Sequence, residues 1–307
     1  MPRLAFVFPG QGAQYKGMGK ELAERYEEAY EVFAEADDIA GYKISTLCFE
    51  DPKSQLNYTE YAQPAILTTS LAILQVVKKI GLSPVLFAGL SLGEYSALVA
   101  GGAISFREAL PLVQTRARLM QNAVLPGKGA MAAVIGLDDS SVSDACRQVG
   151  GVVDIANYNC PGQLVISGEK EAVLNAGEIL KAAGGRVSLL AVSVPSHSKL
   201  MSDAAVKLQP YLSKVNWQKS QIDIVSNVNA RENTPGEFAD LLERQLYCPV
   251  LWEQSVRYMM GKVDYFIEIG PGSTLSGLIR RIDRSRLIGQ VEDSKTLEKV
   301  VEKVKSL

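Results

Sequence analysis

Histidine and cysteine are scarce in this sequence of 307 residues. His197 is the only histidine, and the four cysteines are scattered at Cys48, Cys146, Cys160 and Cys248. They form no Cys-x-x-Cys pair, and none lies near the histidine in sequence. These spacings exclude the usual zinc sites and argue against a disulfide framework. The sequence therefore predicts no bound metal and a reducing, cytoplasmic location.

Long apolar runs and an excess of one charge are absent as well. No window approaches the ~18 uncharged apolar residues of a membrane span, and residues 1–4 do not resemble a secretory signal. The net charge of −2 gives no electrostatic case for a nucleic acid or membrane partner. With 47% hydrophobic and 21% charged residues, the composition is that of a soluble globular protein with one large domain or two smaller ones.

Short β-rich apolar runs recur along the chain, separated by helical patterns. Strands that alternate with helices predict an α/β fold with a mostly parallel sheet. The predicted strands of this kind cover 4–8, 85–88, 222–225, 265–269 and 287–291, and a final helix covers 296–304.

The middle third of the chain has a different pattern. It predicts strands over 130–136, 152–156, 163–167 and 186–192 and helices over 140–149 and 169–183. The order β-α-β-β-α-β is that of a ferredoxin-like unit. Plausible hinges at Pro126 and Pro195 flank it, so we predict a small domain over 128–197 inserted into a large domain made of 1–127 and 198–307. His197 then lies where the chain returns to the large domain, at a cleft of the kind that favours ligands.

The segment GLSLG at 89–93 is a Gly-x-Ser-x-Gly motif centred on Ser91. It follows the predicted strand 85–88 and precedes a helical pattern over 92–100. This is the strand-to-helix elbow that exposes a nucleophilic serine, with glycines permitting the tight turn. A helix cap in a glycine-rich turn is the alternative role for Ser91, and we favour the nucleophile.

A serine hydroxyl is a poor nucleophile until a base accepts its proton. His197 is the only imidazole available for that task. No Asp or Glu has a context that marks it as the third partner, and a backbone carbonyl could orient the ring equally well. The loop FPGQG at 8–12, which precedes a helical pattern running to about Ala40, can present N–H groups to an anion. One of them and the amide of Leu92 would form an oxyanion hole; a plain strand-to-helix turn is the alternative, and from these residues alone we favour it.

Arg116 lies on the apolar side of a helical pattern over 106–124. It follows Val113 by three residues and precedes Met120 by four, so it faces the interior, whereas Arg118 faces solvent. An unpaired buried charge is very costly. The partner of Arg116 is therefore either an internal carboxylate or a substrate carboxylate gripped by the planar guanidinium.

Several linked motifs resemble the malonyl-CoA:acyl carrier protein transacylase family. They are FPGQGAQ at 8–14, GLSLGEYSAL at 89–98, PSH at 195–197 and IGPG at 269–272, and the likeness runs from Leu4 to about Arg281. The resemblance implies a large α/β-hydrolase-like domain with an inserted ferredoxin-like α+β domain. It further implies transfer of malonyl from malonyl-CoA to the phosphopantetheine thiol of an acyl carrier protein in fatty acid biosynthesis, through malonyl-Ser91 and with no bound cofactor.

The same resemblance implies a role for each matching residue. Ser91 is the acylated nucleophile, His197 is its base, and the main-chain carbonyl of Gln245 orients His197. The amides of Gln11 and Leu92 form the oxyanion hole. The substrate-binding residues implied are Arg116, which holds the malonyl carboxylate, Met120 and Asn159, the last in a turn over 157–162.

Three positions depart from the family pattern. Leu90 stands where the family usually has histidine, Ser198 where many members have cysteine, and Cys160 where many have serine. Leu90 bears on the tuning of the pocket and not on the mechanism.

The predicted partners are malonyl-CoA and an acyl carrier protein, and the expected oligomeric state is a monomer. Arg280 and Arg281 belong to a basic cluster that would contact the acidic carrier or the CoA phosphates; a solvated helix end is the alternative. Two other functions stay open, a stand-alone acyltransferase of a polyketide synthase and a serine esterase or thioesterase. The hydrolase would not need an inward-facing Arg116.

Overall fold

Two β-sheets organise the chain in the computed structural model, which describes residues 2–192 and 194–307. Met1 and Ser193, which belong to the predicted domain ranges, lie outside the described residues. The larger sheet has the strand order β7-β2-β1-β8-β9, and all neighbouring strands in it run parallel. The predicted α/β architecture is therefore confirmed. Its strands are β1 Leu4–Phe8, β2 Leu86–Gly89, β7 Asp223–Val225, β8 Tyr265–Ile269 and β9 Leu287–Val291.

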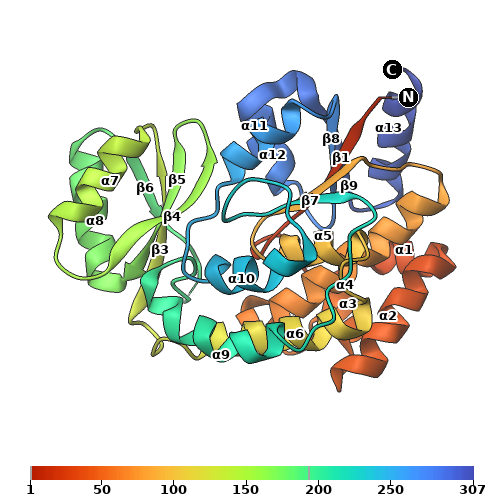
Figure 1. Cartoon of the computed structure of the whole chain (residues 1–307), viewed down its shortest axis with the longest axis horizontal. Helices are drawn as coiled ribbons and strands as arrows, with labels where there is room; N and C mark the ends of the chain where they lie inside the picture. Colours follow the sequence, from red (N-terminus) through yellow and green to blue (C-terminus); the bar gives the residue numbers. More distant parts are fainter. Residues whose placement is uncertain (1, 193) are drawn as a thin grey trace.

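Helices cover both faces of the parallel sheet (Figure 1). Because successive side chains of a strand point to opposite faces, Phe6 and Phe8 of β1 pack into one core and Ala5 and Val7 into another. This two-sided burial explains why the strand is apolar at every position. The helices are α1 Lys20–Arg25, α2 Glu27–Ala40, α3 Ile44–Glu50, α4 Thr59–Lys79, α5 Gly93–Ala100, α6 Phe106–Gln121, α7 Asp139–Gln148, α8 Lys170–Ala182, α9 Ser202–Leu212, α10 Pro235–Gln245, α11 Trp252–Met260, α12 Thr274–Asp283 and α13 Ser294–Lys305.

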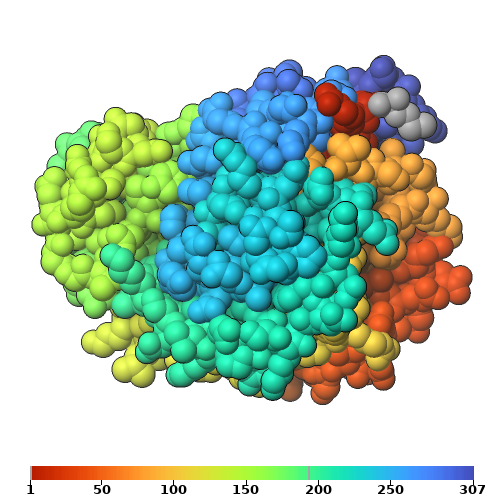
Figure 2. All heavy atoms as spheres, in the orientation of Figure 1, coloured from red at the N-terminus to blue at the C-terminus, as the bar shows by residue number. Residues whose placement is uncertain are grey.

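The smaller sheet is antiparallel and has the order β4-β5-β3-β6. Its strands are β3 Gly129–Ile135, β4 Val153–Cys160, β5 Gln163–Glu169 and β6 Arg186–Leu189. With α7 and α8 packed against it around a core of its own, this segment has the predicted ferredoxin-like element order. Figure 1 shows it beside the large α/β unit, and in Figure 2 it forms the lobe at the left.

The chain enters and leaves the small unit at one place. A β-carbon on Gly129 would lie 2.5 Å from Cδ of Pro195, so the incoming and outgoing segments of the chain lie side by side there. All elements of the small sheet fall within the predicted range 128–197; the boundaries themselves stay a prediction.

Several predicted elements are wrong in extent; α6, for example, ends at Gln121 and not at 124. The helix expected to run to about Ala40 is split into α1 and α2, because Tyr26 has extended backbone angles, and it does not begin until Lys20. Strand β6 ends at Leu189 instead of 192. Strand β4 continues to Cys160 through two bulges, so the turn expected from 157 is confined to the residues between β4 and β5.

The carboxyl ends of β1, β2 and β7 share one edge of the parallel sheet, where open α/β sheets place their ligands. Ser91 follows β2 at that edge and Gln11 follows β1. Within residues 2–192 and 194–307, none of the helices combines the length and the apolarity needed to cross a membrane.

Candidate active site

Ser91 occupies a tight turn between β2 and α5. Its φ of +52° lies in the left-handed region, which non-glycine residues seldom adopt and which marks functional sites. The loop after β1 presses against this turn: a β-carbon on Gly10 would lie 2.5 Å from the carbonyl oxygen of Leu90. Gly93 is crowded in the same way by the carbonyl of Phe8. Glycines thus let the two loops meet, as the elbow motif predicts.

His197 reaches Ser91 across 106 positions of sequence. Its Nε2 lies 2.8 Å from Ser91 Oγ, and its Nδ1 lies 2.7 Å from the main-chain oxygen of Gln245. A carbonyl oxygen can only accept, so the ring proton is on Nδ1 and Nε2 is free to accept the serine proton. The predicted pairing of Ser91, His197 and the Gln245 carbonyl is thus present as geometry, with a carbonyl where hydrolase triads have an acid.

Burial keeps His197 neutral. The side chain is almost wholly covered, and desolvation together with the nearby positive charge of Arg116 lowers the pKa of His197 to about 4. A backbone φ of +59° holds the residue in a second left-handed conformation. His197 is therefore fixed in place as an unprotonated acceptor at neutral pH.

Arg116 is fully buried beside the nucleophile. Its Nη1 donates to Gln63 Oε1 at 2.6 Å, and its Nη2 donates to Gln245 Oε1 at 2.9 Å and to Ser91 Oγ at 3.3 Å. Burial lowers the pKa of the guanidinium, and the charge also lies 5.3 Å from the ring centre of Tyr95. Among the described residues, its polar partners are neutral oxygens, and its Nε has none.

These contacts bear on the two partners that the sequence leaves open for Arg116, and binding of a substrate carboxylate stays a prediction. Within the described chain it forms no ion pair with an internal carboxylate. Glu94 is buried nearby, but its Oε2 accepts from the Gln245 side chain at 2.6 Å, which separates the carboxylate from the guanidinium. A buried cation without a directly bonded anion favours an incoming carboxylate as its partner.

A cavity of about 240 Å³ opens between the two sheets in front of Ser91. Ser91, His197, Gln11, Met120 and Asn159 are all among its lining residues. Arg116 is not, but two of the residues to which it donates, Gln63 and Ser91, are.

The two amides expected to form an oxyanion hole are free. Within residues 2–192 and 194–307, neither the Gln11 nor the Leu92 N–H has a hydrogen-bond acceptor. Both follow carboxyl ends of neighbouring strands, β1 and β2. Free backbone donors at such a place suit a developing negative charge, and their role stays a prediction.

Asn159 and Met120 both line the cavity. Asn159 lies on β4 and not in a turn as predicted, because β4 stays paired with β5 past 156 through two bulges. Its Oδ1 is buried and has no partner within the described residues. Met120 lies on α6 one turn beyond Arg116, and its sulfur accepts from Gln63 Nε2 at 3.6 Å. Substrate binding by either residue stays a prediction.

Arg280 and Arg281, on α12, are both exposed and point in different directions. Arg281 donates to Gln163, a residue of the cavity wall, whereas Arg280 lines a separate shallow hollow with α13. Contact of either arginine with a carrier protein or with CoA stays a prediction.

Sequence reasoning missed three residues of this site. Gln63, Glu94 and Asn227 are buried polar residues that touch Arg116, Gln245 or the Ser91 backbone. Gln63 interrupts the apolar pattern of α4, which is a usable signal. Asn227 and Glu94 carry no local signal, because their partners are distant in sequence.

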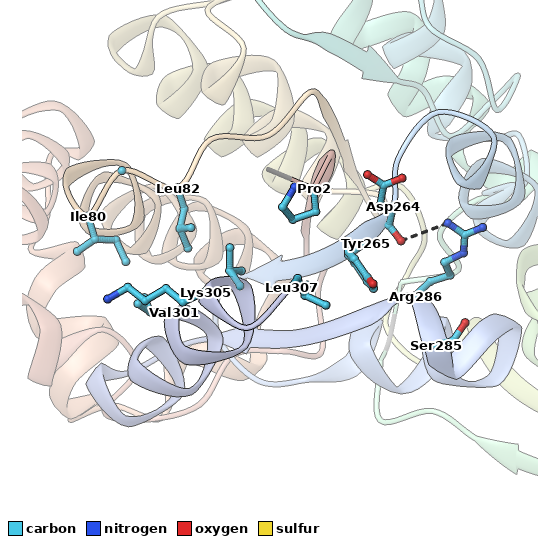
Figure 3. Close-up of a pocket in the computed structure, with 12 residues that line it drawn as sticks. Pro2, Ile80, Leu82, Asp264, Tyr265, Ser285, Arg286, Val301, Lys305 and Leu307 are labelled. Atoms are coloured by element: carbon cyan, nitrogen blue, oxygen red, sulfur yellow. Dashed lines mark hydrogen bonds between the residues drawn. The ribbon is translucent and has the colours of Figure 1, made fainter.

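A second, larger hollow lies away from Ser91. A groove of about 900 Å³ lies at the amino ends of β8 and β9, lined among others by Leu82, Arg286 and Leu307 (Figure 3). Arg286 is bonded there to the carbonyl of Asp264 at 3.3 Å. None of the groove's lining residues belongs to the Ser91 cavity, and the groove offers no activated nucleophile.

The arrangement around Ser91 can perform nucleophilic acyl transfer. It supplies a serine, a neutral base within hydrogen-bonding distance, free backbone donors and a buried cation.

Comparison with known proteins places this chemistry in a family. Residues 5–303 match the family described as acyl transferase domain. The chain is 44% identical to the malonyl CoA-acyl carrier protein transacylase of Bacillus subtilis, over 99% of this chain and 98% of the relative. It is 48% identical to the protein of the same name from Escherichia coli K12, over 92% and 93%.

Among solved structures, one similar complex is of a type II PKS acyl-carrier protein with its malonyl-transacylase. The TM-score is 0.95 at 44% identity, and the match covers 98% of this chain and 99% of that one. With its fold, its serine elbow and these relatives, the chain belongs to the acyl transferase domain family, alongside the malonyl CoA-acyl carrier protein transacylases.

Proposed function

We propose that this protein transfers the malonyl group from malonyl-CoA to the phosphopantetheine thiol of an acyl carrier protein, and so supplies malonyl carrier protein for fatty acid biosynthesis. The observation that carries the proposal is the contact of Arg116 with Ser91 Oγ, which places a buried cation next to the nucleophile. An esterase for uncharged acyl groups would only incur the desolvation cost of that cation. The relatives' names favour this function over the polyketide and hydrolase alternatives.

The proposed reaction has two halves. His197 Nε2 accepts the Ser91 proton while Oγ attacks the thioester carbon, and the oxyanion is held by the amides of Gln11 and Leu92. The carbon–sulfur bond breaks, and the CoA thiolate takes the proton from His197. In the second half the carrier thiol gives its proton to His197 and attacks malonyl-Ser91, and Ser91 recovers the proton as it leaves. No bound cofactor is needed, because every group in the scheme is a side chain, a backbone amide or a substrate.

A chase experiment tests this function. Wild-type protein incubated with malonyl-CoA should gain one malonyl group on Ser91 by intact mass and peptide mapping. Added holo carrier protein should discharge it much faster than buffer does, because the acceptor is a thiol and not water. Release to water at an equal rate with and without carrier would identify a hydrolase, and no adduct at all would reject acyl transfer from malonyl-CoA.

The depressed pKa of His197 predicts an unusual pH profile. Only the neutral imidazole can accept the serine proton, so acylation is lost as pH falls through the pKa of about 4. We expect kcat/KM for malonyl-CoA, which reports the free enzyme, to stay level across the neutral range and to fall only below about pH 5. The rate of Ser91 acylation, followed at a series of pH values, measures this profile. A loss of kcat/KM centred near the ordinary histidine pKa of ~6.5 would contradict the buried, neutral base.

We also propose that the protein acts as a monomer, because one chain supplies Ser91, His197, Gln245 and Arg116. Its four cysteines are free, which suits the reducing cytoplasm that we propose as its location. The carrier would approach the open side of the Ser91 cavity, where Arg281 lies near Gln163.

A further inference from the structure

The Asn227 side chain adds two hydrogen bonds to the parallel sheet beyond the end of β7. Strand β7 pairs with β2 as far as Val225 opposite Ala88. Beyond that point Asn227 Nδ2 donates to the Gly89 oxygen at 2.6 Å, and its Oδ1 accepts from the Ser91 amide at 2.6 Å. In a parallel ladder one residue bonds to the oxygen and the amide that flank a single partner residue. The carboxamide of Asn227 makes that pattern around Leu90 in place of a backbone peptide.

Both peptide bonds that flank Ser91 are held by carboxamides. On the amino side, Asn227 Oδ1 accepts from the Ser91 N–H. On the carboxyl side, Gln245 Nε2 donates to the Ser91 carbonyl oxygen at 3.1 Å. A trans peptide points its C=O and N–H in opposite directions. Fixing the Ser91 oxygen therefore also fixes the direction of the Leu92 N–H, the proposed oxyanion donor.

Glu94 ties the two carboxamide residues together. Its Oε2 accepts from the Asn227 amide at 3.1 Å and from Gln245 Nε2 at 2.6 Å. Glu94, Asn227 and Gln245 are all buried, so water does not compete for these bonds. The Glu94 carboxylate thus fixes the positions of Asn227 and of the Gln245 side chain.

We infer that Asn227 is a positioning residue of the reaction: its carboxamide, anchored with Gln245 on Glu94, holds the strained Ser91 elbow so that Oγ meets His197 and the Leu92 amide meets the oxyanion. The inference deepens the proposed function and rests on it. A left-handed serine does not keep its conformation without such support, because the backbone strain costs of the order of 1–3 kcal/mol. Donors must also be placed before the reaction to be effective.

The experiment compares Asn227→Leu, which removes both bonds, with Asn227→Asp, and uses Asn229→Asp as control. Asn229 is exposed two residues further on and bonds only to its own loop in the described structure. For Asn227→Leu we expect kcat of Ser91 acylation to fall about 10²-fold with KM for malonyl-CoA within about threefold, because no contact with the substrate is removed. The control should behave as wild type.

The aspartate variant gives a second readout, the pH dependence of kcat, which a purely structural role of Asn227 would leave unchanged. Its introduced carboxyl, when protonated, has one O–H donor and one carbonyl acceptor, which restores both bonds of Asn227. The ratio of its kcat to that of wild type should therefore rise at least several-fold from pH 8.5 to 6, whereas the leucine ratio stays flat. Glu94 contacts this position directly, and Arg116 and His197 lie beyond Gln245. Burial raises the pKa of Glu94 to about 7, so in the aspartate variant its titration is coupled to that of the introduced carboxyl. The leucine variant keeps Glu94 and has no second carboxyl, so its ratio to wild type shows what Glu94 contributes by itself.

The outcomes are distinct. Absence of an adduct in wild type rejects the proposed function. An adduct in wild type with unchanged kcat in both Asn227 variants, a change in KM alone, or an aspartate ratio independent of pH overturns the positioning role. If the leucine variant does not fold, the aspartate pH profile alone decides.

Discussion

Ser91→Ala is expected to abolish the covalent malonyl adduct and to lower carrier malonylation by at least about 10⁴-fold, the scale seen when a nucleophile is removed from an acyl-transfer site. The reason is that Ser91 Oγ is the only hydroxyl placed 2.8 Å from His197 Nε2 in the described structure. Without it there is no activated nucleophile to take up the malonyl group. Intact mass after incubation with malonyl-CoA measures the adduct, and a radiolabelled or mass-based carrier assay measures the transfer.

Ser96→Ala is the matched control for this substitution. Ser96 lies on α5 five residues further on, is fully buried, and its Oγ has no hydrogen-bond partner among the described residues. Its replacement removes a comparable hydroxyl without touching His197, so adduct formation should persist. An undiminished adduct in Ser91→Ala would place the acylated residue elsewhere and would refute the proposed nucleophile.

Arg116→Ala is expected to change substrate preference. Malonyl transfer should lose about 10²–10³-fold in kcat/KM, because truncating one partner of a buried hydrogen-bonded charge pair costs ~2–5 kcal/mol. Acetyl transfer should lose far less, since acetyl has no distal carboxylate. A smaller loss is shared by both substrates, because Arg116 also donates to Ser91 Oγ at 3.3 Å. The ratio of malonyl to acetyl kcat/KM therefore isolates the carboxylate contact.

The charge of Arg116 also acts on the base. It helps to lower the pKa of His197, so its removal makes His197 more basic and partly offsets the loss for both substrates alike. Arg118→Ala is the control: Arg118 lies two residues along α6, is exposed, and faces away from the site. Equal losses on both substrates, with thermal stability also lowered, would mean that Arg116 serves packing of Gln63 and Gln245 and not the substrate.

Much of the fold follows from local sequence patterns. Strands β1, β8 and β9 have the predicted bounds, and β2 is displaced by one residue. Their alternation and apolar runs are set by residues two apart, so a single segment contains the signal. The errors arise where the backbone departs from a pattern for tertiary reasons, as at Tyr26, whose side chain packs against the core between α1 and α2.

The site divides in the same way. The elbow at Ser91 and the inward face of Arg116 are readable from spacing alone, because turn chemistry and helix periodicity are local. The neutral surroundings of Arg116 are not readable, since Gln63 lies 53 positions away and Gln245 lies 129 positions away. The separation of Glu94 from the guanidinium by one carboxamide is likewise a matter of packing.

The sequence by itself determined that this protein has a parallel α/β unit, a ferredoxin-like insert, one serine elbow and one imidazole. Only the tertiary structure decided that the imidazole is oriented by the Gln245 carbonyl, that Arg116 has no directly bonded anion among the residues the structure describes, and that Asn227 extends the sheet to the nucleophile. Periodic patterns record which face of an element is buried. Hydrogen bonds between carboxamides and backbone depend on which distant segments meet, and no repeat in the sequence encodes that.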